Sequence, residues 1–193
     1  MNEAAKKWRI CASVLVGVGL LTAGFADSGE QSGETGQPWQ GIKKAVAVVH
    51  PTAEGKTSGE VRFEENNDGS VTVTVALEGL QPNQQHAFHV HEYGDCTHDS
   101  GDSAGDHYNP GGHPHRLPDE DGPRHAGDLG NLDADQNGQA ELVRTVDNLT
   151  IAGSNNPVLG RSLIVHAERD DGGQPSGNAG ARIACGVIGV AGS

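Results

Sequence analysis

Residues 60–77 read E-V-R-F-E-E-N-N-D-G-S-V-T-V-T-V-A-L, and this stretch decides the fold class of the chain. Apolar residues recur at every second position in residues 60–64 and again in residues 71–77, which is the period of a half-buried β-strand. The N-N-D-G sequence at 66–69 lies between them and consists of turn-forming residues. The stretch therefore predicts two antiparallel strands joined in a hairpin.

Further short strands are predicted on both sides of this hairpin, at residues 45–49, 85–91, 140–146, 162–166 and 181–188. Two long stretches, 92–130 and 168–180, have no periodicity, and long irregular loops in a compact domain are often functional. The sequence D-A-D-Q-N-G at 133–138 begins like a calcium loop, but Arg144 stands where such a loop needs Glu. We interpret it as a hairpin turn. Many short strands with frequent turns predict an all-β, antiparallel sandwich or barrel.

Composition and charge exclude several classes of protein. The chain has 193 residues, 29 of them Gly, and only 4% aromatic residues, so it has room for one domain but few long helices. A formal net charge of −13 argues against nucleic acid and anionic membranes as partners. The same charge means that an anionic substrate would need a local positive field within an acidic protein.

Residues 1–26 have the pattern of a signal peptide, with a basic start, an apolar run and small residues before the cleavage point. The basic residues are Lys6, Lys7 and Arg9, and the small residues are Gly24 and Ala26. An uncleaved membrane anchor and a lipoprotein signal at Cys11 are the alternatives. The apolar run is short for a membrane-spanning helix, and Cys11 lies at its start, so cleavage is favoured. We expect no membrane segment after cleavage, and a periplasmic or secreted protein.

Residues 27–40 are rich in Gly, Ser and Glu and predict a flexible linker, which leaves residues 41–193 as the folded domain. Once Cys11 is removed, Cys96 and Cys185 remain. An even pair of cysteines in an exported protein is typical of one disulfide, and two free buried thiols are the alternative. Such a disulfide would close a loop of about 90 residues and stabilise the fold by at most about 4–5 kcal/mol.

Ten histidines against three cysteines place any metal chemistry in nitrogen ligands. The H-V-H sequence at 89–91 presents two imidazoles on one face of a predicted strand and directs Val90 into the core. His166 ends the apolar run 163–165, where a strand would ordinarily carry another hydrophobic residue. It is either a hydrogen-bonded core residue or a metal ligand, and the nearby H-V-H favours the ligand.

The irregular stretch 92–130 contains a second group, formed by His107, His115, His125 and Asp128. Three imidazoles with one carboxylate suit tetrahedral zinc. Proline and glycine residues along the loop can bend it so that distant ligands converge. A solvated histidine-rich loop is the alternative, but it does not explain the G-D-L-G sequence directly after His125 and Ala126.

Five collinear segments resemble the copper/zinc superoxide dismutases: F-H-V-H-E-Y-G-D at 88–95, S-A-G-D-H-Y-N-P at 103–110, R-H-A-G-D-L-G-N at 124–131, L-I-V-H-A-E-R-D-D at 163–171 and G-N-A-G-A-R-I-A-C-G-V-I-G at 177–189. The resemblance covers about residues 43–190. It implies an all-β, antiparallel Greek-key β-sandwich or barrel of immunoglobulin-like type, with two long functional loops. It also implies an oxidoreductase that converts superoxide to O2 and hydrogen peroxide by copper redox cycling, with a structural zinc.

The resemblance assigns a role to each of the residues above. The copper ligands it implies are His89, His91, His107 and His166. The zinc ligands it implies are His107, His115, His125 and Asp128. His107 would bridge the two metals and, with Arg182, would be catalytic, because Arg182 would guide the anion to copper. Asp170 would link ligands of the two metals from outside both sets, and a Cys96–Cys185 bridge would tie the ligand loop to the last strand.

Two further histidines are expected to lie outside both metal sites. His113 competes with His115 for one zinc position, but the family spacing after His107 favours His115, so His113 should be exposed. His86 resembles a buried structural histidine of the family. The stretch 171–181 is short and has no Lys, unlike the longer loops of the family, which predicts weaker steering of the anion and a more open channel.

An apolar patch resembling that of the dimeric members of the family predicts a homodimer; its residues are Val46, Val48, Gly94, Leu159, Val187 and Val190. A rival function is that of a copper or zinc carrier or metallochaperone that kept the sandwich and lost turnover. Such a protein should lack a copper ligand or the channel arginine, and this chain has all of them. A purely structural sandwich would leave the loop histidines unexplained.

Overall fold

The computed structural model describes residue 39 and residues 41–192. The predicted signal peptide and the predicted linker, apart from Trp39, lie outside the described residues. Within the described part, no helix has the length and apolar character needed to cross a membrane.

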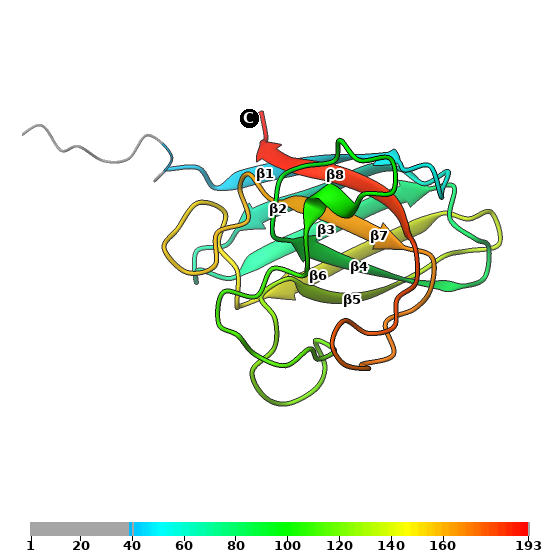
Figure 1. The fold of residues 1–193 in the computed structure, drawn as a ribbon. Helices are drawn as coiled ribbons and strands as arrows, with labels where there is room; N and C mark the ends of the chain where they lie inside the picture. The colour runs from blue at the N-terminus through cyan, green and yellow to red at the C-terminus, as the bar shows by residue number, and fades with distance from the viewer. Residues whose placement is uncertain (1–38, 40, 193) are drawn as a thin grey trace, which may run out of the picture. The chain divides into compact units, whose positions relative to one another are not determined.

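The described residues form eight β-strands and one short 3-10 helix (Figure 1). The elements are β1 (Lys44–Pro51), β2 (Ser58–Glu65), β3 (Val71–Glu78), β4 (Gln85–His91), η1 (Asp102–Ala104), β5 (Asp128–Asp133), β6 (Ala140–Val146), β7 (Ser162–His166) and β8 (Arg182–Val190). The predicted hairpin is confirmed, since β2 and β3 pair antiparallel around the turn at 66–69, where Gly69 donates to the carbonyl oxygen of Asn66 over 3.1 Å.

The strands follow the order β5-β4-β7-β8-β1-β2-β3-β6, and every ladder between neighbours is antiparallel. The chain crosses from β3 to β4 and back from β6 to β7, which is the Greek-key connection. The two end strands, β5 and β6, run close to each other, so the sheet curls into a nearly closed barrel (Figure 1). The all-β prediction is confirmed.

Alternating side chains fill the interior of the barrel. In β3, Val71, Val73, Val75 and Leu77 are buried, and the threonines between Val71 and Val75 are not. In β4, by contrast, six consecutive residues are buried, because the strand faces the core on one side and the loops on the other. Phe88 and Val90 belong to the core, as predicted for Val90, and His89 and His91 face away from it.

The structure differs from the sequence prediction at β5. Residues 128–133 fall partly within the stretch predicted to be irregular, yet they form a strand paired with β4. Asp128 to Gly130 are all buried, so the strand lacks the alternation that identifies a half-exposed strand. The turn at 133–138 is confirmed, but the strands on either side of it, β5 and β6, pair with β4 and β3 and do not form a two-stranded hairpin.

Candidate metal centre

Backbone pairing across neighbouring strands brings the predicted site residues together. The cross-strand pairs are His89–Asp128, His91–His107 and His166–Arg182. Two of the ladders are irregular at the site, β4–β5 between Ala87 and His89 and β7–β8 at His166. Such irregularities re-aim side chains next to functional sites, and here they turn the imidazoles toward one another.

The four residues expected to hold copper form one buried group. They are His89, His91, His107 and His166, and one potential ligand atom of each lies within 4.8 Å of those of the others. Atoms bound to a single ion at about 2.1 Å can be at most about 4.2 Å apart, so the group is close to the size that one ion requires. The imidazole ring centroids of His89 and His107 are 4.0 Å apart.

The four residues expected to hold zinc form a second buried group around one carboxylate oxygen. Asp128 Oδ1 lies 3.0 Å from His107 Nδ1, 2.9 Å from His115 Nδ1 and 3.2 Å from His125 Nδ1. The edge of a tetrahedron of zinc ligands at about 2.0 Å is about 3.3 Å. The spacing therefore matches a tetrahedral ion, and His107 belongs to both groups.

Unpaired nitrogens provide a test of whether these groups fit metal ions. Five buried ring nitrogens have no hydrogen-bond partner among the described residues: His89 Nδ1, His91 Nε2, His115 Nδ1, His125 Nδ1 and His166 Nε2. A buried polar atom without a partner is unfavourable by about 1–3 kcal/mol. All five belong to the two groups, so the residues present fit two metal ions that would take these lone pairs.

The second ring nitrogen of most of these histidines is held from outside the site. Nδ1 of His91 lies 2.9 Å from the carbonyl oxygen of Gly105, and Nδ1 of His166 lies 3.4 Å from that of Gly180. A carbonyl oxygen only accepts, so each Nδ1 carries the proton and each Nε2 presents a lone pair to the first group. Such outer hydrogen bonds fix the tautomer and the ring orientation of a metal ligand.

Asp170 connects the two groups. His89 Nε2 donates to its Oδ2 over 3.0 Å, and His115 Nε2 donates to its Oδ1 over 2.8 Å. The backbone of Asp170 is itself fixed by Asn131, which accepts from its N–H over 2.7 Å and donates to its carbonyl oxygen over 2.9 Å. The carboxylate therefore holds one imidazole of each group in a set position.

Burial and the two carboxylates set the protonation of the centre. Burial lowers the pKa of His89 to about 4 and keeps the pKa values of His91 and His166 well below their usual range. These three rings are neutral at pH 7, which is the form that binds metal. Burial also lowers the pKa of His115, but the neighbouring carboxylates of Asp128 and Asp170 outweigh it and raise that pKa to about 9.

The carboxylates remain ionised. Burial raises the pKa of Asp128, but the three surrounding histidines lower it more, so the pKa ends far below its usual value. The same opposition holds for Asp170, whose pKa is lowered by His115, His89 and the N–H of Gly172. Two buried negative charges therefore lie beside the imidazoles and favour a cation between them.

A cleft of about 570 Å³ opens onto the first group and contains Arg182. The Arg182 guanidinium donates from Nη1 to the carbonyl oxygen of Gly101 over 2.8 Å and from Nη2 to that of Gly105 over 2.7 Å. The edges of His91, His107 and His166 line the same cleft. A fixed positive charge is thus placed beside the first group, where an anion would arrive.

The remaining predictions about this region can now be compared with the structure. His113 is exposed, as predicted, and lies outside both groups, with its backbone bonded to the Asn109 side chain. His86 is buried, as predicted, and its Nδ1 donates to the carbonyl oxygen of His166 over 2.9 Å. Cys96 and Cys185 form the predicted disulfide, which ties the loop after β4 to β8.

Sequence reasoning missed the groups that support the site. Asn131 and Gln174 carry no metal chemistry of their own, and each acts on a residue far away in the sequence. The carbonyl oxygens of Gly101, Gly105 and Gly180 are backbone groups, so no side chain in the sequence indicates that they act as acceptors. No sequence signal for these partners exists before the strand pairing is known.

Comparison with known proteins agrees with this geometry. A sequence model of the family described as copper/zinc superoxide dismutase (SODC) matches residues 57–188. A protein of Onchocerca volvulus named extracellular superoxide dismutase [Cu-Zn] is 42% identical over 174 residues, which cover 84% of each chain. The crystal structure of the clock protein EA4 superposes with a TM-score of 0.70 at 35% identity, over 78% of this chain and 96% of the other. This chain belongs to the copper/zinc superoxide dismutase family.

Proposed function

We propose that this protein is a superoxide dismutase in which two superoxide anions and two protons give O2 and hydrogen peroxide. The observation that carries the proposal is the pair of buried donor groups that share His107, with Arg182 in the cleft beside one of them. A metal carrier would need the donor groups but not a fixed cation at the cleft. The complete ligand sets and Arg182 therefore favour turnover over transport.

The chemistry of each donor set supports one metal. His89, His91, His107 and His166 supply four imidazoles, which suit copper, and His107, His115, His125 and Asp128 suit tetrahedral zinc. Copper supplies the one-electron couple on which the reaction depends, and zinc has no redox chemistry. Asp170 holds His89 and His115 at fixed angles, so that each set keeps its geometry.

Arg182 supplies the local positive charge that an anionic substrate needs in this acidic chain. Its guanidinium is the cationic side chain in the cleft, and two carbonyl oxygens hold it in place. A positive charge at the bottom of a cleft focuses the local field even where the surface as a whole repels anions. We assign to Arg182 the binding and orientation of superoxide beside His91 and His166.

His107 is the residue placed to move a proton. Its Nδ1 lies 3.0 Å from Asp128 Oδ1 in the second group, which leaves Nε2 for the first group. His107 also borders the cleft, so Nε2 is within reach of a bound anion. We assign to His107 Nε2 the task of holding a proton and passing it to the peroxide product as it forms.

The deciding experiment measures superoxide consumption by protein loaded with copper and zinc, beside His89→Ala and Arg182→Ala. The proposal expects rapid, copper-dependent consumption by the wild type. His89→Ala should lose copper and activity together, whereas Arg182→Ala should keep copper and lose most of its rate. A loaded wild-type protein that does not accelerate superoxide decay contradicts the proposal.

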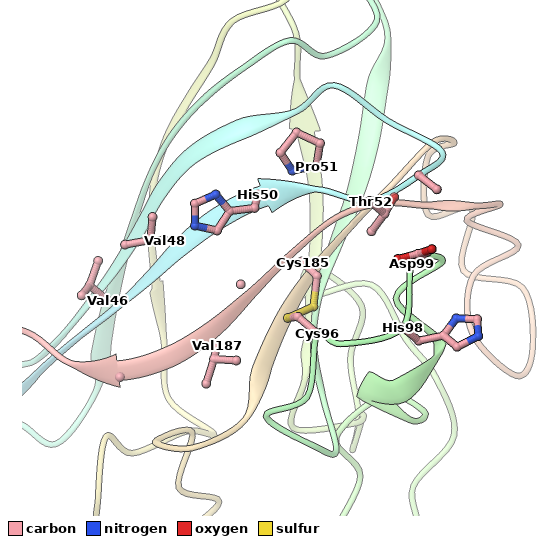
Figure 2. Close-up of a pocket in the computed structure, with 13 residues that line it drawn as sticks. Val46, Val48, His50, Pro51, Thr52, Cys96, His98, Asp99, Cys185 and Val187 are labelled. Carbon is pink, nitrogen blue, oxygen red and sulfur yellow. A yellow bond between two sulfur atoms is a disulfide. The ribbon is translucent and has the colours of Figure 1, made fainter.

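We also propose that two copies associate through an apolar groove formed by β1, β8 and the disulfide (Figure 2). Val46 and Val48 of β1 and Val187 of β8 line this groove beside Cys96 and Cys185. Val48 is 53% exposed and Val187 is 44% exposed, although both lie in the middle of a sheet. Exposed valines on adjacent strands suit a second copy of the same surface, related by two-fold symmetry.

The oligomer proposal is tested by light scattering coupled to size-exclusion chromatography at micromolar concentration. A mass of two chains is expected for the wild type and of one chain for Val48→Glu. Val143→Glu is the matched control, because Val143 is 70% exposed on β6, outside the groove. A monomeric wild type contradicts the proposal.

We further propose that the protein acts outside the cytoplasm, as a periplasmic or secreted enzyme. The disulfide between Cys96 and Cys185 supports this, because disulfides persist in oxidising compartments. The sequence pattern of residues 1–26 and the extracellular relative support it too. N-terminal sequencing of the exported protein is the test, and a mature chain that begins near residue 27 is expected.

A further inference from the structure

The loop between β7 and β8 contacts the zinc-ligand loop through a side chain that no metal chemistry requires. The carboxamide of Gln174 donates from Nε2 to the carbonyl oxygen of His115 over 2.7 Å. Its Oε1 accepts from the backbone N–H of the same residue over 3.1 Å. Both backbone groups of His115 are thus held by one side chain 59 positions further along the chain.

These two bonds complete the fixation of His115. Its Nε2 donates to Asp170 Oδ1 over 2.8 Å, and its Nδ1 faces Asp128 Oδ1 at 2.9 Å. Gln174 and Asp170 both belong to the segment between β7 and β8. One segment therefore holds His115 at both its ring and its backbone, and Nδ1 is the ring nitrogen left to bind a metal in exchange for its proton.

The segment is braced internally, so Gln174 reaches His115 from a fixed position. The Asp171 carboxylate accepts from the N–H of Gly173 over 2.8 Å and from Asn178 Nδ2 over 3.2 Å. The N–H of Asp171 donates to the carbonyl oxygen of Gly177 over 3.0 Å. A loop that is already ordered loses little further conformational entropy when it makes a contact. The two hydrogen bonds of Gln174 can therefore fix the orientation of His115 at a small entropic cost.

The same segment forms part of the wall of the cleft. Gln174, Pro175 and Ser176 line it together with His107 and Arg182. We propose that Gln174 is a positioning residue for zinc. It holds His115 in the geometry that binds zinc, and it links the zinc site to the wall of the cleft. The inference rests on the proposed function, because it takes His115 as a zinc ligand.

The test compares zinc affinity in Gln174→Ala, Gln174→Glu and the control Gln136→Ala. Glu at position 174 keeps the acceptor for the His115 N–H but sets a carboxylate against the His115 carbonyl oxygen, so it should weaken zinc at least as much as Ala. Partners outside the ligand set typically contribute a factor of about 10–100 to metal affinity, and a loss of that size is expected for both. Gln136 lies exposed in the 133–138 turn and should have no effect.

Two readouts separate positioning from general stability. Zinc affinity is measured by competition with a chromophoric chelator, and the ligand geometry by the visible absorption of Co2+ placed in the zinc site. The proposal expects weaker zinc and altered Co2+ bands in both Gln174 variants, with urea unfolding of the metal-free protein close to wild type. Unchanged zinc affinity overturns the proposal. A lower zinc affinity also overturns it if the Co2+ spectrum is unchanged and the metal-free variant unfolds at lower urea, because the loss would then come from general stability.

The wild type distinguishes failure of this inference from failure of the proposed function. If the wild-type protein takes up neither zinc nor Co2+, the metal assignment is wrong and the role of Gln174 falls with it. If the wild type takes up both and Gln174→Ala behaves identically, the metal assignment stands and only the role of Gln174 is wrong.

Discussion

Arg182 and His91 donate hydrogen bonds to the same acceptor, the carbonyl oxygen of Gly105, over 2.7 Å and 2.9 Å. The cleft cation, which also bonds the carbonyl oxygen of Gly101, and one imidazole of the first group are therefore linked through a shared backbone atom. Gly105 has a φ of 76°, and a Cβ there would lie 2.7 Å from Tyr93 Cδ2, so this backbone position requires glycine. The arrangement makes the contribution of Arg182 open to direct test.

Replacement of Arg182 should reduce catalysis without removing copper. Arg182→Ala removes the charge that focuses the field in the cleft, and kcat/KM is expected to fall by about 10–100-fold. Arg182→Lys restores a charge but cannot bond both carbonyl oxygens with a planar fork, so an intermediate rate is expected. Stopped-flow superoxide decay with metal analysis checks this, and equal rates in all three proteins would count against the role of Arg182.

Carboxylates at the cleft should slow the approach of superoxide. Glu92 and Asp106 both line the cleft, and Asp106 is exposed. Asp106→Asn is expected to raise kcat/KM about twofold at low ionic strength, since a unit charge about 10 Å away contributes about 0.4 kcal/mol in water. The gain should vanish in high salt, where the charge is screened. A gain that persists in high salt would show that the substitution acts by another route.

The salt dependence of the wild type follows from the same charges. The segment 171–181 contains no Lys, so Arg182 focuses the field with little help from that loop. The rate should therefore fall only weakly as salt is added. A fall as steep as in family members with long, charged loops would show that steering is stronger than the cleft residues account for.

The metal-free protein should be most stable near pH 6.5. Burial lowers the pKa of His89 to about 4 and the pKa values of His91 and His166 well below normal. Below pH 6.5 these histidines become protonated in the unfolded chain but stay neutral in the folded protein. The free energy of unfolding should therefore decrease as pH falls from 6.5 toward 4. Urea titrations of the metal-free protein across this range check the sign.

His115 should lower the stability of the metal-free protein on the alkaline side of pH 6.5. Its pKa is raised to about 9 in the folded protein, so the stabilisation from its bound proton is complete below pH 6.5 and is lost as pH rises through 9. Asp170→Asn removes one of the carboxylates that hold this proton and should flatten the decline between pH 6.5 and 9. A wild type whose stability rises steadily from pH 6.5 to 9 is incompatible with this assignment.

Loss of the disulfide should destabilise the domain strongly. The Cys96–Cys185 bridge spans 89 positions, for which loop-closure entropy gives at most about 4–5 kcal/mol. The double variant Cys96→Ala/Cys185→Ala should therefore melt roughly 10 °C lower than the wild type, both without metal. Calorimetry measures the difference, and equal melting temperatures would mean that the bridge contributes nothing to the folded state.

The sequence predicted the histidines of the two groups better than the residues that support them. His89, His91 and His166 could be predicted because a strand has a period of two and a histidine there interrupts an apolar pattern. The strand β5 could not, because its first three residues are all buried and the alternation is lost there. The supporting contacts of Gln174 and Asn131 depend on which segments pair across 59 and 39 positions, and this is settled only when the barrel closes.

One measurement tests the central claim, that the groups sharing His107 hold copper and zinc for superoxide disproportionation. Superoxide decay is followed by stopped flow for wild-type protein that is metal-free, zinc-loaded, or loaded with one copper and one zinc per chain. Fast decay is predicted only for the protein with both metals, and the zinc-loaded protein should match the metal-free one. Decay with copper and zinc no faster than the metal-free background would contradict the account.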